Sequence, residues 1–216
     1  MDEHAAMMAE IEAEMRETAR LTGRARLSPR VAAALAKVRR VAFVPPNAAN
    51  VAHANRPLPI GHGQTISQPF IVALMTELLD LEPDDKVLEV GTGSGYQAAV
   101  LAELAREVCS IEVIPELARG AAAALASEGY TSVLLRTGNG ALGWPEQAPF
   151  DAIIVTAAGP EIPPALIEQL GPSGRMVIPV GPHHGDHDLI LLTKNAAGNV
   201  TRHSVLPVAF VPLTSG

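Results

Sequence analysis

Cysteine and aromatic residues are scarce in this 216-residue sequence, which has one cysteine, Cys109, and an aromatic fraction of 3%. A single cysteine excludes an internal disulfide bond and a cluster of thiolate metal ligands. Long apolar runs are lacking too, and none approaches the roughly 20 residues that a membrane-spanning helix needs. The apolar residues are mainly Ala, Val, Leu and Ile, and 48% of the chain is hydrophobic, enough for a substantial core.

Positive charge is also in short supply, because 16 Lys and Arg stand against 23 Asp and Glu, which gives a net charge of -7. An acidic surface argues against nucleic acid or an anionic membrane as a partner. The first 15 residues, MDEHAAMMAEIEAEM, are acidic and amphipathic, unlike a signal or transit peptide. We therefore expect a soluble, cytoplasmic protein, and we expect it to be a monomer.

The first part of the chain, residues 1–82, is predicted to be mainly helical. Residues 5–20 favour a helix, and a second one is predicted over residues 28–40, with Ser28 as its N-cap and proline in its first turn. Prolines, glycines and asparagines then interrupt every periodic pattern, until a third helix begins around Pro69. Because irregular segments of this length inside a compact domain are often functional, we expect residues 1–82 to carry the active-site and substrate segment.

Residues 83–216 alternate between short apolar strands and helices, which is typical of an α/β protein. We predict a Rossmann-like, doubly wound, mostly parallel sheet with helices on both faces and an N-terminal helical extension. Two further segments flank a turn near the C-terminus and are predicted to form antiparallel strands at the sheet edge. The two parts are expected to form one compact domain. The strands are predicted at 86–90, 108–113, 132–137, 151–158, 175–180, 188–195 and 201–213, and the helices at 96–106, 115–129 and 163–170.

The sequence VLEVGTGSGY, residues 87–96, indicates a buried strand that runs into a glycine-rich turn. Gly91, Gly93 and Gly95 would let the backbone approach a ligand, although a tight turn also needs glycine for steric reasons alone. Glu112 ends the next strand, and an acidic residue about 20 positions after such a turn is placed to bind a ribose diol. By itself Glu112 could equally be a surface residue.

Glu89, two residues before the first glycine, distinguishes two ligand classes. A dinucleotide would place its pyrophosphate at this turn, and a nearby carboxylate would repel it. S-adenosylmethionine carries a sulfonium and an ammonium group there, which a carboxylate would attract. The alternative is that Glu89 caps a helix or pairs with a lysine.

Two further segments contain candidate site residues. In TGNG, residues 137–140, Asn139 offers a carbonyl oxygen to an adenine amine, although Asn-Gly often marks only a turn. In GHGQTISQPF, residues 61–70, Ser67 precedes a helix, and the local sequence favours helix capping as its role. A nucleophilic role is disfavoured, because G-x-S-x-G and assignable His and Asp partners are missing. A third possibility is that Ser67 donates a hydrogen bond to a substrate carboxylate.

Together these segments resemble the protein-L-isoaspartate O-methyltransferase family. The resemblance rests on PLPIGHGQTISQPFIVALMTELL, VLEVGTGSGYQAAVLAEL, PFDAIIVTAA, IPPALIEQL and FVPLT, which follow in order from about Val31 to Thr214, and QTISQP is its specific part. It implies methylation of the α-carboxylate of L-isoaspartyl residues in damaged proteins, with S-adenosylmethionine as the donor. It also implies that Ser67 is the active-site serine. The cofactor-contacting positions would be Gln64, Thr65, Ile66, Ser67, Val72, Glu89, Gly91, Gly93, Gly95, Glu112, Val113, Asn139, Gly140 and Thr214.

Some features leave other interpretations open. The family commonly has Asp at the position of Asn139, so a non-catalytic relative that acts through protein contacts is one alternative. A nicotinamide-dependent oxidoreductase on a similar sheet is another, although a full G-x-G-x-x-G fingerprint is missing. The histidines and aspartates of HHGDHD, residues 183–188, invite a metal site, but we expect an exposed turn there and no metal. His62 is expected to be a structural histidine in a glycine-bounded turn.

Overall fold

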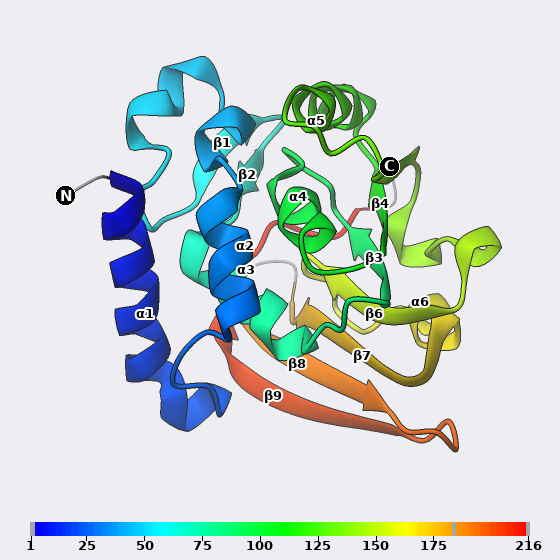
Figure 1. Ribbon diagram of the computed structural model, residues 1–216. Helices are drawn as coiled ribbons and strands as arrows, with labels where there is room; N and C mark the ends of the chain where they lie inside the picture. The colour runs from blue at the N-terminus through cyan, green and yellow to red at the C-terminus, as the bar shows by residue number, and fades with distance from the viewer. Residues whose placement is uncertain (1–2, 183–184, 215–216) are drawn as a thin grey trace.

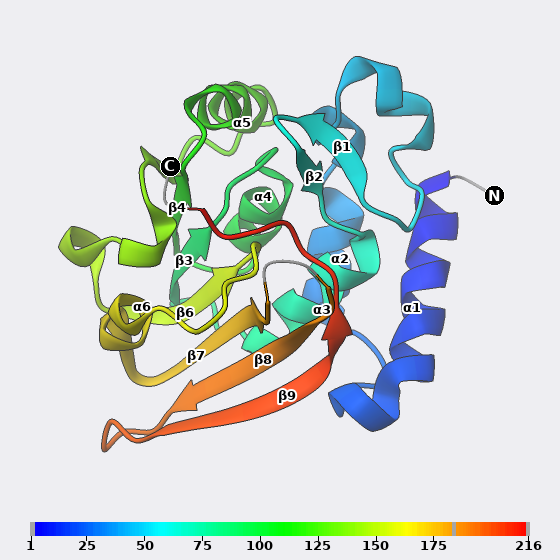
Figure 2. The same ribbon diagram turned by 180° about the vertical axis from the view of Figure 1, so that it is seen from behind.

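The central element of the fold is a seven-stranded sheet with strand order β5-β4-β3-β6-β7-β8-β9 (Figures 1 and 2). The computed structural model describes residues 3–182 and 185–214. The first five strands of this order are parallel, and β8 and β9 are antiparallel to their neighbours. The predicted Rossmann-like fold with antiparallel C-terminal edge strands is therefore confirmed. The strands are β3 (Lys86–Val90), β4 (Glu107–Glu112), β5 (Leu134–Thr137), β6 (Phe150–Val155), β7 (Leu170–Val180), β8 (His187–Lys194) and β9 (Val200–Val208).

The chain runs from β3 outward to β5 and then crosses back to β6 on the other side of β3. The strand order therefore reverses between β3 and β6, and ligands of open α/β sheets bind at the carboxyl ends of the strands at such a point. The helices are α1 (Glu3–Thr22), α2 (Pro29–Lys37), α3 (Pro69–Leu79), α4 (Tyr96–Ala102), α5 (Pro115–Ser127) and α6 (Pro164–Gln169), and the 3-10 helices are η1 (Arg40–Phe43), η2 (Pro46–Val51), η3 (Gly140–Leu142) and η4 (Pro145–Gln147).

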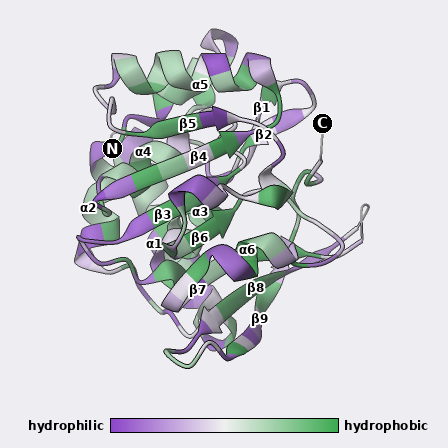
Figure 3. Ribbon diagram, turned by 90° about the vertical axis from the view of Figure 1, so that its right-hand side faces the viewer, coloured by the Kyte–Doolittle hydropathy of each residue, from purple (hydrophilic) through white to green (hydrophobic). Residues whose placement is uncertain are grey.

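Successive strand residues point to opposite faces of the sheet, which divides the core into two clusters. In the larger cluster, Val87 and Ile154 of the sheet pack with apolar residues from helices α1 to α5. In the smaller one, Leu88 and Ile153 pack with Leu166 of α6. The strands between them are strongly apolar, and the hydrophobic colour follows much of β4, β6 and β8 (Figure 3). Among the described residues, no helix is both long and apolar enough to cross a bilayer.

The N-terminal helix α1 packs against α3 and the end of β9 (Figure 2). Its buried residues Met7, Ile11 and Met15 recur every four positions, which places them on one face of the helix. The expected N-cap of α2 is confirmed, because the Ser28 hydroxyl accepts a hydrogen bond from the Val31 backbone N–H. This arrangement holds the predicted N-terminal helical extension against the sheet and beside the carboxyl end of β9.

The segment between α2 and α3 is more regular than predicted. It contains η1, η2 and a small antiparallel pair, β1 (Leu58–Gly61) and β2 (Gln64–Ile66). His62 occupies the turn of this pair with φ of 52° and is exposed. The short pair fixes residues 64–66 over the carboxyl ends of the central strands, where they line a cleft.

Candidate active site

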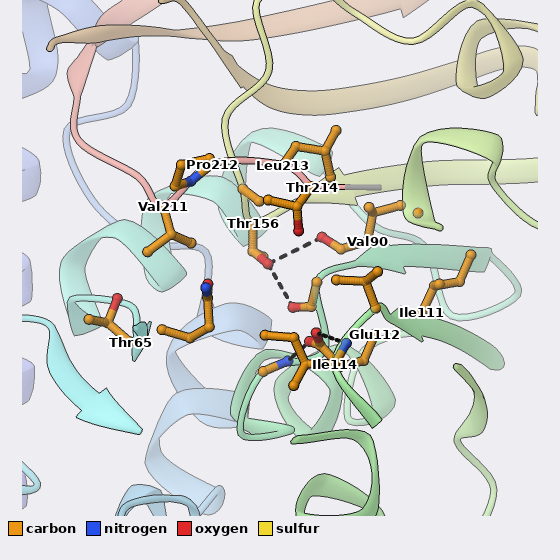
Figure 4. Close-up of a pocket in the computed structure, with 16 residues that line it drawn as sticks. Thr65, Val90, Ile111, Glu112, Ile114, Thr156, Val211, Pro212, Leu213 and Thr214 are labelled. Carbon is orange, nitrogen blue, oxygen red and sulfur yellow. Dashed lines mark hydrogen bonds between the residues drawn. The ribbon is translucent and has the colours of Figure 1, made fainter. Parts of the chain in front are cut away.

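A cleft, here called the central cleft, lies at the carboxyl ends of β3, β4 and β6 (Figure 4). Its floor is the glycine turn after β3, where Gly91, Gly93 and Gly95 have φ of 98°, 54° and 90°. These left-handed conformations favour glycine, as the sequence predicted. Among the described residues, the lining is Gln64, Thr65, Ile66, Ser67, Val72, Val90, Gly91, Thr92, Gly93, Ser94, Tyr96, Gln97, Ile111, Glu112, Val113, Ile114, Gly140, Thr156, Ala157, Val211, Pro212, Leu213 and Thr214.

Four backbone N–H groups of the glycine turn donate within the protein. Those of Gly91 and Thr92 reach the Ile111 carbonyl oxygen at 2.8 and 3.2 Å, and that of Gly95 reaches the Thr92 carbonyl oxygen at 2.8 Å. The Gly93 N–H donates to Glu112 Oε2 at 2.8 Å. A turn that binds a pyrophosphate instead directs such groups at the ligand. This turn is therefore poorly suited to a dinucleotide.

Glu112 ends β4 and presents its carboxylate to the central cleft, as predicted (Figure 4). Its second oxygen, Oε1, accepts a hydrogen bond from the Ile114 N–H at 3.0 Å, so two backbone donors fix the side chain. Within the described lining of the central cleft, Glu112 is the only charged side chain. The cleft therefore favours a ligand that carries positive charge or hydroxyl donors and disfavours a phosphate.

Glu89 lies beneath the glycine turn and is fully buried, and it is not among the described residues that line the cleft. Its Oε2 accepts a hydrogen bond from the Ser110 hydroxyl at 2.5 Å, whereas its buried Oε1 has no partner. Burial raises the pKa of Glu89 to about 8, the Ser110 bond opposes this, and nearby Glu112 adds to it. The carboxyl is thus mostly protonated at neutral pH, and its contact with a cationic ligand stays a prediction. Among the described residues, Glu89 neither caps a helix nor pairs with a lysine, so both alternative roles are wrong.

Thr156, which the sequence analysis missed, connects β6 to the glycine turn. Its hydroxyl donates to the Gly91 and Val90 carbonyl oxygens, at 2.7 and 3.2 Å (Figure 4). A methyl group added at Gly91 would run into the Thr156 hydroxyl, so the close approach itself requires glycine. Its position in the sequence could have identified it, because Thr156 directly follows the apolar strand β6, which pairs with β3.

The C-terminal segment crosses the carboxyl ends of the strands and forms another wall of the central cleft. The Ala158 N–H donates to the Val211 carbonyl oxygen at 2.8 Å, and the Leu213 N–H donates to the Ala158 carbonyl oxygen at 2.7 Å. These two bonds hold Thr214 at the cleft, where the family resemblance had placed it.

The Asn139 side chain forms a hydrogen bond with the local backbone and does not line the cleft. Its Oδ1 accepts a hydrogen bond from the Ala141 N–H at 2.9 Å and so caps η3. It is not among the described lining residues, whereas Gly140 is. The role of Asn139 as an acceptor for adenine stays a prediction, and the turn that Asn-Gly often marks is present.

Ser67 lies between β2 and α3 and lines both the central cleft and a second depression, here called the outer groove. Its hydroxyl has no hydrogen-bond partner in the described part of the chain. The capping alternative is wrong, because the N-cap of α3 is Gln68 and the Phe70 N–H is satisfied by Asn55 Oδ1 at 3.0 Å. Thr65 and Thr156 line both spaces as well, so the central cleft and the outer groove adjoin at these three hydroxyl side chains.

Most of the predicted site residues are therefore brought together, and Glu89, Gly95 and Asn139 are the ones that do not line the central cleft. Gly95 lies behind it, where an added methyl group would press on Leu125 of α5. The structure brings no acid–base pair to the Ser67 hydroxyl among its described neighbours, which agrees with the absence of a nucleophile motif.

The histidine-rich segment differs in part from the exposed turn that we predicted. Residues 183 and 184 lie outside the described residues. His187 begins β8 and is buried, with Nε2 3.1 Å from the Pro182 carbonyl oxygen and Nδ1 accepting from the Phe210 N–H at 3.3 Å. His187 therefore anchors the C-terminal segment to β8. Within the described residues, no three His, Cys, Asp or Glu side chains are gathered as a metal ion requires.

The sheet order, the acidic cleft and a glycine turn with satisfied N–H groups define a Rossmann-like protein of the methyltransferase class rather than a dinucleotide-dependent dehydrogenase. The chain belongs to the protein-L-isoaspartate(D-aspartate) O-methyltransferase family, whose model matches residues 13–216. It is 57% identical over 208 residues to protein-L-isoaspartate O-methyltransferase 2 of Polaromonas sp., covering 96% of this chain and 99% of that one. It is 54% identical over 212 residues to the protein of the same name from Syntrophobacter fumaroxidans, covering 98% and 86%.

Two solved structures share the fold across nearly the whole chain. One is a protein-L-isoaspartate O-methyltransferase with a TM-score of 0.77 and 25% identity, covering 95% of this chain and 65% of that one. The other, from Plasmodium falciparum, was assigned to the same enzymes and crystallised with S-adenosyl-L-homocysteine. It has a TM-score of 0.77 at 21% identity and covers 97% and 99% of the two chains, a likeness that concerns the fold alone.

Proposed function

We propose that this protein transfers a methyl group from S-adenosylmethionine to the α-carboxylate of L-isoaspartyl residues in damaged proteins. Membership of the family supports this reaction. The observation that carries the proposal is the position of Ser67, which lines both the central cleft and the outer groove and has no hydrogen-bond partner for its hydroxyl among the described residues. A donor molecule in one space and an acceptor in the other would meet at this side chain.

The residues of the central cleft fit S-adenosylmethionine. Glu112 is placed to accept hydrogen bonds from a ribose diol, and the apolar side chains of Val90, Ile111 and Val113 give a flat wall for an adenine ring. Among the described lining residues there is no Lys, Arg or His that would attract a phosphate. When bound, S-adenosylmethionine supplies an activated methyl group on a positively charged sulfur. We assign its binding to the eleven positions implied by the family resemblance that line the central cleft, with Ser67 as the catalytic residue.

The chemistry places few demands on acid–base groups. A carboxylate is already an anionic nucleophile at neutral pH, so no general base has to activate it. The task of the protein is to align the carboxylate and to exclude water. Ser67 donates a hydrogen bond to one carboxylate oxygen and leaves the other free to attack, and the hydroxyl of Thr65 lies on the same wall. The adjacent backbone amide nitrogen then attacks the methyl ester and methanol leaves, which forms a succinimide. Water hydrolyses the succinimide in part to normal aspartate and so begins repair.

We further propose that the protein acts as a monomer on the proteins of the cytoplasm. The acidic net charge of -7 supports a freely soluble protein, and the buried thiol of Cys109 is compatible with a reducing compartment.

The direct test incubates the protein with a labelled methyl donor and a matched pair of isoaspartyl and aspartyl peptides. We expect base-labile label on the isoaspartyl peptide alone. Ser67→Ala should reduce single-turnover methyl transfer at least tenfold and leave the dissociation constant of S-adenosyl-L-homocysteine within about threefold of wild type. Because no acid–base pair depends on Ser67, the loss should be the same across pH 6 to 9.

Two outcomes would contradict the proposal. Label on neither peptide, from a protein that still binds S-adenosyl-L-homocysteine, would favour the non-catalytic relative. Stabilisation against heat by NAD but not by S-adenosyl-L-homocysteine would favour the oxidoreductase. Unchanged methyl transfer in Ser67→Ala would remove the catalytic role of this serine alone.

A further inference from the structure

The outer groove has a volume of about 500 Å³ and lies between α1, the start of α3 and the C-terminal end of β9. Figure 2 shows these three elements side by side. Most of the lining is apolar, with Pro57, Phe70 and Ile71 on one side and Leu206, Val208 and Phe210 on the other. Among the described lining residues, Glu14 of α1 is the only charged side chain. The groove therefore combines apolar walls with a single negative charge.

Amide donors fix the Glu14 carboxylate in the groove that Ser67 also lines. Its Oε2 accepts from Asn55 Nδ2 at 2.9 Å, and Gln68 Nε2 lies 3.2 and 3.4 Å from its two oxygens. Gln68 is the residue next to Ser67, and Asn55 also holds the N-terminus of α3. The carboxylate is thus held at a defined place in the groove that a peptide must enter to reach Ser67.

Both partners of Glu14 are neutral, and no cationic side chain of the described chain forms an ion pair with it. The side-chain amides of Asn55 and Gln68 need only a hydrogen-bond acceptor, which a neutral glutamine side chain at position 14 would also supply. The charge itself is therefore left for an incoming group. A lysine or arginine suits this environment, because its aliphatic stem packs on apolar walls while its charged end reaches a carboxylate.

We propose that the outer groove selects isoaspartyl segments that carry a lysine or arginine close to the damaged residue, and that Glu14 determines this preference. The inference rests on the proposed function, since it assumes that the groove receives the methyl-accepting segment. Acidic neighbours of the isoaspartyl residue are disfavoured for the same reason, because they meet an uncompensated like charge. The partial exposure of Glu14 limits the size of the effect, and salt weakens it.

The test uses three isoaspartyl peptides that differ only in one flanking residue, which is Lys, Gln or Glu, with this residue placed on either side in two series. For wild type at low salt we expect kcat/KM to be about tenfold higher for the Lys than for the Glu peptide, mostly through KM, in at least one series. At 0.5 M salt the ratio should fall to about two. Glu14→Gln should bring the ratio close to one at either salt concentration, and Glu14→Lys should invert it.

The matched control is Glu17→Gln, which removes the same charge from the exposed side of α1, outside the groove. It should keep the wild-type ratio, and this outcome separates a local contact from the net charge of the protein. The binding of fluorescent peptides to the complex with S-adenosyl-L-homocysteine, followed by anisotropy, gives a readout that does not need methyl transfer. The same order, Lys above Gln above Glu, is expected there.

An equal loss of activity on all three peptides in Glu14→Gln would mean that the carboxylate only supports α3, and would overturn the inference. A wild-type ratio near one in both series, in kinetics and in binding, would overturn it as well. Absence of methyl transfer from every peptide would instead refute the proposed function, and anisotropy would still show whether the groove prefers a cation.

Discussion

At the residue scale, Glu89 is notable because its carboxyl group is enclosed completely beneath the glycine turn. Its folded-state pKa of about 8 lies above the ordinary value of 4.5 because burial disfavours the charged form. The folded protein therefore holds this proton more tightly than the unfolded chain does. The contribution of Glu89 to stability is fully present below pH 4.5, declines between pH 4.5 and about 8, and is lost above that range.

We expect Glu89→Gln to be more stable than wild type above pH 8, by roughly 4 to 5 kcal/mol, because glutamine has no charged form to bury. At pH 5 the difference should vanish or reverse, since the variant then retains only an altered hydrogen bond to Ser110. Urea unfolding of both proteins at pH 5, 7 and 9 measures the change. Glu168→Gln, exposed on α6, serves as the control and should follow wild type at every pH. Parallel curves for Glu89→Gln and wild type would show that Glu89 ionises normally in the folded protein.

The identity of most site residues could be inferred from the sequence, whereas the direction of their side chains could not. The family-like segments pointed to Ser67, Glu112 and Gly140, and the structure places all three in the lining of the cleft. Whether a side chain points into the cleft or toward the protein interior depends on its hydrogen-bond partners. Glu89 is bonded to Ser110, and Asn139 is bonded to the Ala141 backbone. These partners follow from strand register and local turn geometry, which the residue pattern alone does not specify.

At the scale of elements, the apolar strands and the longer helices were predicted well, because each combines a clear period with a recognisable end. The small pair β1 and β2 was missed, since Pro57, Pro59, Gly61 and Gly63 indicate a loop when they are considered one by one. β7 is longer than predicted for a related reason. The predicted strand begins only at residue 175, whereas Gly171 and Gly174 lie in a register irregularity of the observed strand beside β6. Turn residues thus marked a bulge as readily as a loop.

The glycine turn between β3 and α4 contacts Thr156, and this contact can be tested by a substitution at Gly91. Gly91→Ala meets two obstacles, a φ of 98° and the Thr156 hydroxyl. We expect it to lower the free energy of unfolding by roughly 2 to 4 kcal/mol and to weaken binding of S-adenosyl-L-homocysteine at least tenfold. Urea unfolding and calorimetric titration measure the two effects.

The chain offers a matched control in Gly198, which has φ of 84° in the turn between β8 and β9 and open space where a methyl group would be added. Gly198→Ala shares the backbone strain without the steric contact, so it should cost about 1 kcal/mol and bind the ligand like wild type. If both alanine variants behaved alike, the contact with Thr156 would have no part in requiring glycine at position 91.

At the scale of the whole molecule, the two parts at 1–82 and 83–216 share one core. Ile11 of α1, Leu35 of α2 and Leu74 of α3 belong to the same buried cluster as Val87 and Val177 of the sheet. The outer groove also draws its walls from both parts, with Glu14 and Phe70 from the first and Leu206 and Phe210 from the second. We therefore propose that the two parts form a single folding unit rather than separable domains.

This proposal predicts one cooperative unfolding transition for the full chain, with equal calorimetric and van't Hoff enthalpies. S-adenosyl-L-homocysteine at 100 times its dissociation constant should stabilise the entire molecule by about 2.7 kcal/mol, although most of the residues proposed to bind it follow position 82. A fragment of residues 83–216 would expose the face of the sheet that α1 to α3 cover, and should lack the near-ultraviolet signal of a packed interior. Two transitions, of which the ligand shifts only one, would instead establish that the N-terminal part folds as a domain of its own, and α1 would then hold Glu14 at the outer groove through a separable interface.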